Sequence, residues 1–272
     1  DLDSARAYAR AAVECRKTLS EDAGLLNDLN PVLVNDAHTL LAQMLVGSVR
    51  HLPKKERKST YEEADRVLAE IRDVVDGRFL YLSDLARVDG QLQKALVSAE
   101  QGRKTWERYL KQSRAYQEKI TGPDGILSDD PVDTLIVLEG IPNTRRYFGH
   151  FLLDINDRDG AIEVATELLD YVRGKQGDRS ARALLAAAYA HEDKDWEAAV
   201  ELLKTLGDAS IAEKPEMTKL LARGLWRAGD RDGARKCIAR GLVTRPQHPL
   251  LVNFSKVLEK RDAINRERKR KR

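Results

Sequence analysis

The chain has 272 residues, of which 42% are hydrophobic and 33% are charged, and its formal net charge is +3. Its two cysteines, Cys15 and Cys237, are too few for a disulfide scaffold or a cysteine-rich metal site, and we expect a reducing, cytoplasmic or nuclear compartment. Apolar runs such as residues 184–190 are far shorter than the roughly 20 residues of a membrane span, and the first residues lack a signal-peptide pattern, so we expect no membrane partner.

The apolar residues recur at the 3.6-residue period of a helix in almost every segment, and no segment shows the period of two expected of a strand. The sequence therefore predicts an all-α protein. The first helix is expected to begin at Asp3 or Ser4 and to bury Tyr8, Ala12, Cys15 and Leu19. The second is expected to begin at Pro31, because proline is tolerated in a first helical turn. Its predicted inward residues are Leu33, Ala37, Leu40, Leu41, Met44, Leu45 and Val49.

A basic loop is predicted at residues 53–58, followed by a helix that runs to Val75. The helix is expected to begin at Ser59, because Ser59 and Glu62 have the spacing of a capping box, in which two side chains satisfy unpaired backbone N–H groups. Two longer helices are predicted near residues 80–99 and 102–120. Gly90 and Gly102 each cost about 1 kcal/mol relative to alanine in a helix, which indicates either a break or close packing at those positions.

Residues 122–135 contain two glycines, two prolines and several acidic residues, and they form the predicted linker between two parts of the chain. We expect an N-terminal helical region over residues 1–121, helical repeats with a capping helix over residues 136–258, and a basic tail over residues 259–272. The acidic residues of the linker, Asp124, Asp129, Asp130 and Asp133, are interpreted as loop and helix-start residues rather than as cation ligands.

The segment 157–161 (DRDGA) returns unchanged at 230–234, and a related turn lies at residues 194–199. Such a spacing is typical of stacked repeats, in which each unit buries its apolar face against the next. Ala161, Ala199 and Ala234 occupy matching positions in three helix pairs, 38 and 35 residues apart. A last helix, from Pro249 onward, is predicted to cap the stack.

These residues resemble the tetratricopeptide repeat (TPR) family. The third unit carries the resemblance, with small residues at Ala222, Ala234 and Gly241, a turn at Gly229 and Asp230, and a proline at Pro246. It departs from the family at Leu225 and Ile238, where the family has aromatics, and the middle unit has an extra residue near its turn. The resemblance covers about residues 144–258 and implies a solenoid of antiparallel helical hairpins. In the first half, similarity to the repeat pattern is weak and is limited to Tyr61, Ala64, Leu68 and Ile71. That half is therefore expected to consist of divergent repeats or to form a helical bundle.

Motifs for catalysis are absent from the sequence. It has no phosphate-binding glycine loop, no metalloprotease or hydrolase motif, and no histidines at metal-ligand spacing, so we expect no enzyme active site, no cofactor and no metal within this chain. The two Asp-x-Asp-Gly segments, at Asp157 and Asp230, are similar to the start of a calcium loop but lack its bidentate glutamate. We interpret both as polar turns between helices.

The candidate binding residues come from the first helices of the repeats, which line a concave groove in the TPR family. The resemblance places Arg146 and His150 there in the first unit, and Lys219, Arg223, Trp226 and Arg227 in the third. Lys219, Arg223 and Arg227 are four residues apart and share one helix face. Cations beside an indole suit a carboxylate or an acidic peptide. The alternative is a solvated basic face with Trp226 packed between helices.

The end of the chain is strongly basic. Residues 259–272 contain eight basic and three acidic residues, which leaves a net charge of −2 for the remainder. The basic residues at the very end are Arg266, Arg268, Lys269, Arg270, Lys271 and Arg272. They are interpreted as a nuclear-localisation cluster, as a non-specific contact to nucleic-acid phosphates, or as the solubilising end of the last helix.

The function that fits these patterns is a protein-interaction or scaffold module that binds a protein or peptide, acidic in character, in a helical-repeat groove. A second hypothesis follows from the absence of an initiating methionine: the chain is the sensor or regulatory array of a larger signalling or defence enzyme. A third is nucleic-acid binding through the basic tail.

Overall fold

The computed structural model describes residues 4, 7–8, 10–15, 31–72, 82–120, 136–173, 177–207 and 211–270, with the backbone alone for residues 31–36 and 265–270. Throughout these ranges the regular elements are helices, which confirms the predicted all-α class. The chain forms two compact units, residues 1–151 and 152–272, and the division falls within α7 (Ile141–Asp154). The predicted linker, residues 122–135, lies outside the described residues and stays a prediction.

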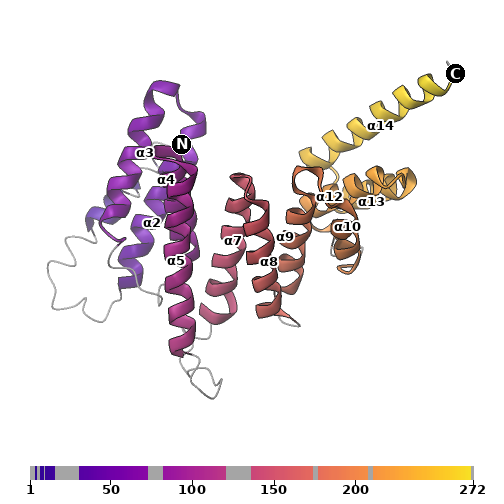
Figure 1. Cartoon of the computed structure of the whole chain (residues 1–272). Helices are drawn as coiled ribbons and strands as arrows, with labels where there is room; N and C mark the ends of the chain where they lie inside the picture. Colours follow the sequence, from indigo (N-terminus) through magenta and orange to yellow (C-terminus); the bar gives the residue numbers. More distant parts are fainter. Residues whose placement is uncertain are drawn as a thin grey trace. The chain divides into compact units, whose positions relative to one another are not determined.

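In the first unit, helices that follow one another in the sequence pack side by side (Figure 1). They are α2 (Pro31–Ser48), η1 (Val49–His51), α3 (Lys54–Ala69), α4 (Leu82–Leu96), α5 (Ala99–Ile120), the π-helical η2 (Ile136–Gly140) and the start of α7. α2 packs on α3 and α4, α3 on α4, and α4 on α5. The core is apolar, and its largest fully buried side chains include Trp106 and Tyr109 on α5 and Leu45, Leu68, Leu85 and Leu92 on the other helices.

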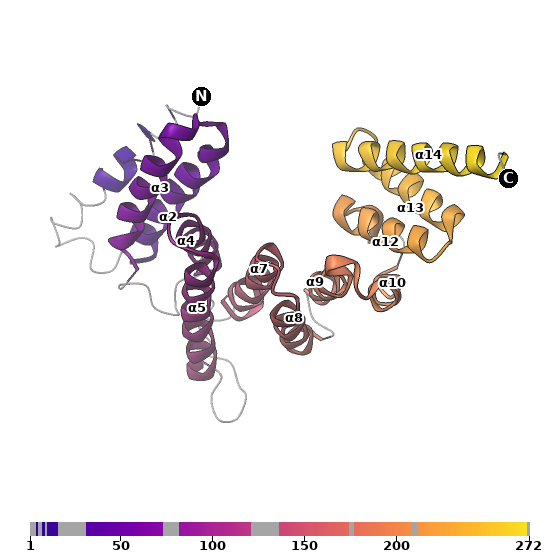
Figure 2. The ribbon, with the colours of Figure 1, turned by 45° about the horizontal axis from the view of Figure 1, so that its top comes forward.

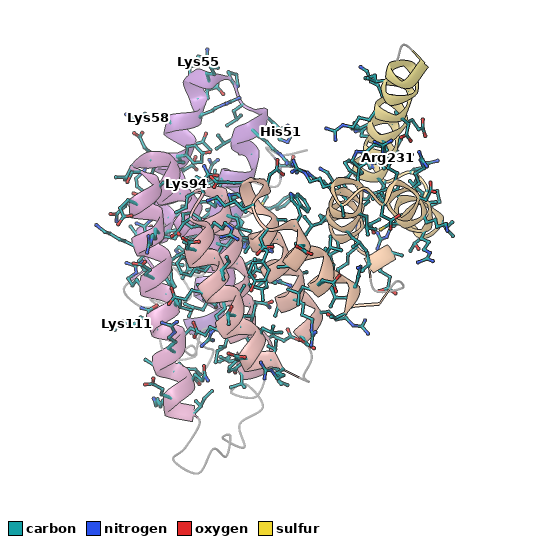
Figure 3. The ribbon with its side chains drawn as sticks, turned by 45° about the vertical axis from the view of Figure 1, so that its right-hand side comes forward. His51, Lys55, Lys58, Lys94, Lys111 and Arg231 are labelled. Carbon is teal, nitrogen blue, oxygen red and sulfur yellow. The ribbon has the colours of Figure 1, made fainter. Side chains whose placement is uncertain are left out.

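The predicted start of α3 is wrong. The helix begins at Lys54, so residues 54–58 are helical rather than a loop, and Lys55 and Lys58 project from its first turns (Figure 3). No capping box forms, because the Ser59 hydroxyl donates a 3.0 Å hydrogen bond back to the Glu56 carbonyl. The lysines, glutamate and arginine of this segment are strong helix formers. The hydroxyl of a serine inside a helix often donates to a carbonyl of the preceding turn, so the capping-box spacing did not mark the start of this helix.

The first predicted helix buries a different face from the one expected. Tyr8 is 79% exposed and Ala12 and Cys15 are also exposed, whereas Val13, on the opposite side, is only 5% exposed. Asp3 and Leu19 lie outside the described residues. In the predicted second helix the inward face is confirmed at Ala37, Leu41 and Leu45 of α2 and at Val49 of η1. Leu40 is exposed, Met44 is half-buried, and the side chain of Leu33 is not described.

The two glycines of α4 and α5 mark a close helix crossing and no break. A Cβ atom on Gly102 would lie 2.7 Å from the carbonyl oxygen of Gly90, and one on Gly90 would overlap the indole of Trp106. The indole in turn lies on Phe148 and Phe151, at centroid distances of 5.8 and 6.1 Å. Close packing was one of the two outcomes predicted for these positions.

The second unit is a series of helices in which each packs on the next (Figures 1 and 2). They are α8 (Arg158–Val172), α9 (Asp178–Ala190), η3 (His191–Asp193), α10 (Trp196–Lys204), α12 (Pro215–Arg227), α13 (Arg231–Thr244) and α14 (Pro249–Arg270). The contacts run α8 to α9, α9 to α10, α10 to α12, α12 to α13, and from α14 to both α12 and α13. Ala161, Ala199 and Ala234 are all fully buried, so the predicted matching positions are confirmed.

The Asp-x-Asp-Gly segments lie at turns between helices, as predicted, and they also cap the helices that follow. The side chains of Asp157 and Asp230 accept hydrogen bonds from the backbone N–H groups of Gly160 (3.0 Å) and Gly233 (2.8 Å). Asp195 does the same for Ala198 in the middle turn, at 3.1 Å. Each of these three aspartates therefore satisfies a backbone N–H group at the start of a helix. Such a cap stabilises the fold by about 1 kcal/mol.

The basic tail begins as part of the last helix. α14 runs to Arg270, so residues 259–270 continue the capping helix, while Lys271 and Arg272 lie outside the described residues. Asp262 is buried against α13, where Arg235 Nε donates to it at 3.0 Å. Among the described helices, no segment has both the length and the apolar composition needed to cross a membrane.

Replacing Gly90 by alanine tests the α4–α5 crossing. We expect Gly90→Ala to lower the free energy of unfolding by about 1–3 kcal/mol, because the added methyl group overpacks a rigid indole. Gly47 in α2 is the matched control, since a Cβ atom there meets nothing within 4 Å. Gly47→Ala is expected to be neutral or stabilising by up to about 1 kcal/mol. Equal effects of the two substitutions in urea unfolding would show that the crossing is not tight.

Candidate binding site around Asp193

The turn between α9 and α10 holds one residue more than the equivalent turns. The N–H groups of Asp157 and Asp230 donate to carbonyls five residues earlier, at Leu152 and Leu225, whereas that of Asp195 reaches back six residues, to Tyr189. The extra residue expected in the middle unit is thus present. The turn accommodates it with two consecutive left-handed residues, Glu192 (φ 53°) and Asp193 (φ 62°). Such angles are uncommon outside glycine, although aspartate tolerates them better than most residues.

The left-handed turn directs the Asp193 carboxylate toward α12. Its Oδ1 accepts a 2.8 Å hydrogen bond from Arg223 Nη2, and its Oδ2 accepts a 2.5 Å bond from Arg227 Nη2. The indole Nε1 of Trp196 donates to the same Oδ1 at 3.3 Å. One carboxylate therefore gathers two arginines from a neighbouring hairpin.

Trp196 provides a surface for both guanidinium groups. The Cζ atoms of Arg223 and Arg227 lie 5.1 and 5.4 Å from its ring centre. At this distance the negative face of an indole attracts a cation. The ring fits because position 224 is a glycine: a Cβ atom there would lie 3.2 Å from Trp196 Cε3 and would overlap Val200. We call Asp193, Trp196, Arg223 and Arg227 the Asp193 clamp.

The clamp is charged and partly exposed, and some N–H donors of its arginines make no hydrogen bond within it. The side chains of Asp193, Arg223 and Arg227 are 40%, 48% and 42% exposed, so its ion pairs contribute only about 0–1 kcal/mol each to stability. Its net charge is +1. A guanidinium carries five N–H donors, and within the described residues each arginine gives one of them, to Asp193. The remaining donors are available to a second acceptor from outside.

Trp226 is not the aromatic beside these arginines. It packs, half-buried, on the core formed by α12, α13 and α14, and the Arg231 Cζ atom lies 5.4 Å from its ring centre. This matches the alternative in which Trp226 lies between helices. Lys219 lies on α12 one turn before Arg223, as its spacing predicted, but it is half-buried where an exposed position was expected. Sequence reasoning missed Asp193 and Trp196, although the extra residue in that turn was a usable signal.

Arg146 and His150 lie on α7 within the first unit. The Cζ atom of Arg146 is 4.8 Å from the ring centre of Tyr147, and Arg87 approaches the same ring at 5.4 Å. His150 is exposed. Because both predicted residues belong to the first compact unit, they are not part of the Asp193 clamp, whose residues all belong to the second. Of the basic tail, residues Arg266, Arg268, Lys269 and Arg270 are described by backbone alone.

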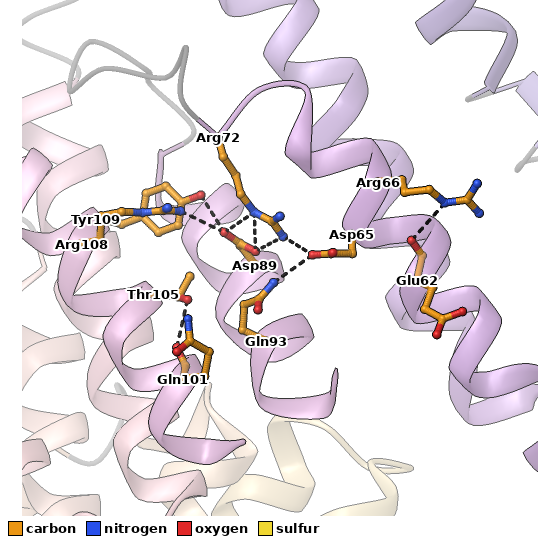
Figure 4. Close-up of polar contacts among 10 residues, drawn as sticks. All are labelled: Glu62, Asp65, Arg66, Arg72, Asp89, Gln93, Gln101, Thr105, Arg108 and Tyr109. Carbon is orange, nitrogen blue, oxygen red and sulfur yellow. Dashed lines mark hydrogen bonds and ion pairs between the residues drawn. The ribbon is translucent and has the colours of Figure 1, made fainter. Parts of the chain in front are cut away.

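A second polar cluster is buried in the first unit, around Asp89 (Figure 4). Asp89 is fully buried on α4 and accepts hydrogen bonds from Arg72 (Nη2, 2.6 Å), Arg108 (Nη2, 3.2 Å) and the Tyr109 hydroxyl (2.9 Å). Arg72 also donates to Asp65 at 2.5 Å. The cluster joins α3, α4, α5 and the turn that follows α3.

The charges of this cluster are strongly coupled. Burial acts to lower the pKa of Arg72, but its hydrogen bonds and ion pairs with Asp89 and Asp65 outweigh that effect and raise the pKa above its ordinary value. Burial, reinforced by the charge of Asp89, raises the pKa of the Tyr109 hydroxyl well above its ordinary value of 10.0. Titratable groups with strongly shifted pKa values often mark active sites. Here Asp89 already accepts from three side chains and is closed to solvent, so we assign it a structural role.

Comparison with known proteins gives a fold and no family. No protein-family model and no curated protein matches the sequence. Among solved structures, BtubC (BKLC) from P. vanneervenii has a TM-score of 0.61 and 16% identity, over 92% of this chain and 94% of that one. YrrB, described as a TPR protein with an unusual peptide-binding site, has a TM-score of 0.43 and 13% identity, over 81% and 91% of the two chains. The likeness to BtubC shows a shared fold and covers most of the first unit as well. With its stacked hairpins, this chain has a TPR-like helical-repeat fold, as the sequence resemblance implied.

Neutralising Asp193 tests the clamp. In Asp193→Asn the backbone conformation is tolerated but the charge is lost, so we expect a shifted Trp196 indole N–H resonance and a stability loss of about 1 kcal/mol or less. The indole resonances of the other two tryptophans, Trp106 and Trp226, should not move. Asp170→Asn, which removes an exposed ion pair on α8, is the matched control. An unchanged Trp196 resonance would contradict the clamp geometry.

The raised pKa of Tyr109 predicts a loss of stability at alkaline pH. The folded chain holds this proton more tightly than the unfolded chain, so the contribution is complete below pH 10 and decreases as the pH rises above it. We expect the free energy of unfolding to fall less steeply above about pH 10 in Tyr109→Phe than in the wild type. Tyr8→Phe is the control, because Tyr8 is 79% exposed. Identical alkaline profiles for wild type and Tyr109→Phe would refute this assignment.

Proposed function

We propose that the chain is a protein-interaction module whose Asp193 clamp binds an acidic, extended segment of a partner protein. The observation that carries the proposal is the pair of arginines held between one carboxylate and one indole. Their unused N–H donors suit a second carboxylate, since charge-assisted bonds from arginine to carboxylate are short and directional. The TPR-like fold is consistent with a binding role.

Preorganisation supports this proposal energetically. An arginine on a free surface loses rotamer freedom when it binds, at a cost of about 0.5–1.5 kcal/mol for each such side chain. Asp193 and Trp196 already restrict Arg223 and Arg227, so part of that cost is met on folding. The partner's carboxylate then adds to the clamp or replaces Asp193 on it.

Positive charge extends along α12 beyond the clamp. Lys219 precedes Arg223 by one turn, so three cations follow one face of the helix, and Asp193 pairs with two of them. An extended segment with carboxylates at intervals matches this row better than a single acidic residue does. Complementary charge of this kind increases the association rate and sets the register of the segment.

Peptide binding to the full chain tests the proposed function. The probes are extended peptides with several aspartates and glutamates, each synthesised together with its asparagine and glutamine counterpart. We expect the acidic members to bind, and Arg223→Glu with Arg227→Glu to weaken them at least about tenfold, because two charge-assisted bonds are lost.

The control is Arg173→Glu, an equal type of charge change at an exposed pair on α8. It should leave the affinity unchanged, and circular dichroism should show all variants folded. Equal binding of the acidic and the amide peptides, or full binding by the Arg223→Glu, Arg227→Glu variant, would rule out the clamp as the site.

A further inference from the structure

A pocket lies on the opposite side of α12 from the clamp. It has a volume of about 230 Å³ and opens between α10, α12, α13 and the helical turn at residues 211–213. From α12 it is lined by Leu221 and Leu225, which are offset by two residues from the clamp's Arg223 and Arg227. Two residues correspond to about 200° around a helix, so the two pairs face opposite ways.

The floor of the pocket is apolar. Besides the two leucines it contains Ile211 and Cys237, and the Cys237 thiol donates to the Thr218 carbonyl at 3.5 Å. Ile211 and Leu221 belong to the buried core and Leu225 packs against it, so the floor is held in place by helices on several sides. An apolar group that enters therefore meets a preformed surface.

The rim of the pocket is cationic. Lys204 comes from α10, and Lys236 and Arg240, one turn apart, come from α13. Lys204 is paired with Glu201 on its own helix at 2.8 Å. The nine lining residues, all within the described chain, include these three cations and no carboxylate. Because the cations come from two helices, a ligand with carboxylates on both sides of an apolar group matches them better than one with a single carboxylate.

The volume decides what kind of apolar group fits. An engineered cavity of about 150 Å³ is large enough to bind benzene, while pockets for drug-sized ligands measure about 300–1,000 Å³. A pocket of about 230 Å³ lies between the two. It accommodates one large side chain, such as leucine or phenylalanine, and is small for a cofactor.

We propose that this pocket docks a second segment of a partner protein, in which one large apolar residue is flanked by acidic residues. The apolar side chain enters between Leu221, Leu225 and Cys237, and the flanking carboxylates meet the cations of the rim. The chain would then hold two segments on opposite faces of α12, and this second site does not depend on the clamp.

The probe for this site is a peptide with three aspartates on each side of one phenylalanine. In ¹H–¹⁵N spectra of the full chain we expect it to shift the resonances of pocket residues, Leu221, Leu225 and Cys237 among them. Measured at these pocket resonances, a peptide with serine in place of phenylalanine should bind about tenfold or more weakly, since burial of a large apolar side chain is lost. Lys204→Glu with Lys236→Glu, both exposed positions, should weaken the phenylalanine peptide to a similar extent.

Cys237 gives a second readout. In Cys15→Ser it is the remaining thiol of the chain, and the bound peptide should slow its reaction with a disulfide reagent. Arg223→Glu with Arg227→Glu should leave both readouts unchanged, which separates this site from the clamp. The proposal is overturned if pocket resonances do not shift, if the serine peptide shifts them with equal affinity, if the clamp variant abolishes these shifts, or if octanoate binds in the pocket while the peptide does not.

Discussion

The close approach of α10 to α12 at Gly224 is the contact on which the Asp193 clamp depends. A side chain at position 224 would overlap Val200 and crowd Trp196, so only glycine lets the indole lie against α12. The indole then supports Arg223 and Arg227 from one side while Asp193 holds them from the other. The same principle operates at Ala161, Ala199 and Ala234 and at Gly90 and Gly102, where small residues set the distance between helices. The arrangement of charged groups at the surface thus follows from packing beneath it.

The repeats share one turn design, and the middle turn departs from it. All three turns end in an aspartate that caps the next helix. The first and third place a single left-handed residue, Asn156 or Gly229, directly before that cap. The middle turn inserts one residue more and uses Asp193 in a left-handed conformation to reach the neighbouring hairpin. Asp193 thus gathers two cations in a conformation that few residues adopt, although half-exposed ion pairs stabilise a fold only slightly.

Local and repeating features of this fold were predictable from the sequence, and contacts between hairpins were not. The returning DRDGA segment and the buried alanines predicted the stacked helix pairs, since both express the periodicity of one unit. The start of α3 was wrong because helix propensity at residues 54–58 competes with a capping pattern and wins. Trp226 was expected beside the arginines because it shares their helix face. The ring that they contact belongs to Trp196, which precedes Arg223 by 27 residues and Arg227 by 31. The helical period relates residues within one helix, so it cannot predict a contact between two helices.

Shortening the middle turn tests the central claim most directly. Deleting Lys194 gives this turn the length of the other two, and the Asp195 cap and the buried Ala199 are kept. The account predicts that the deleted chain stays folded, with a melting temperature within a few degrees of the wild type, but loses its affinity for acidic peptides. A folded deletion variant that binds those peptides as tightly as the wild type would contradict it.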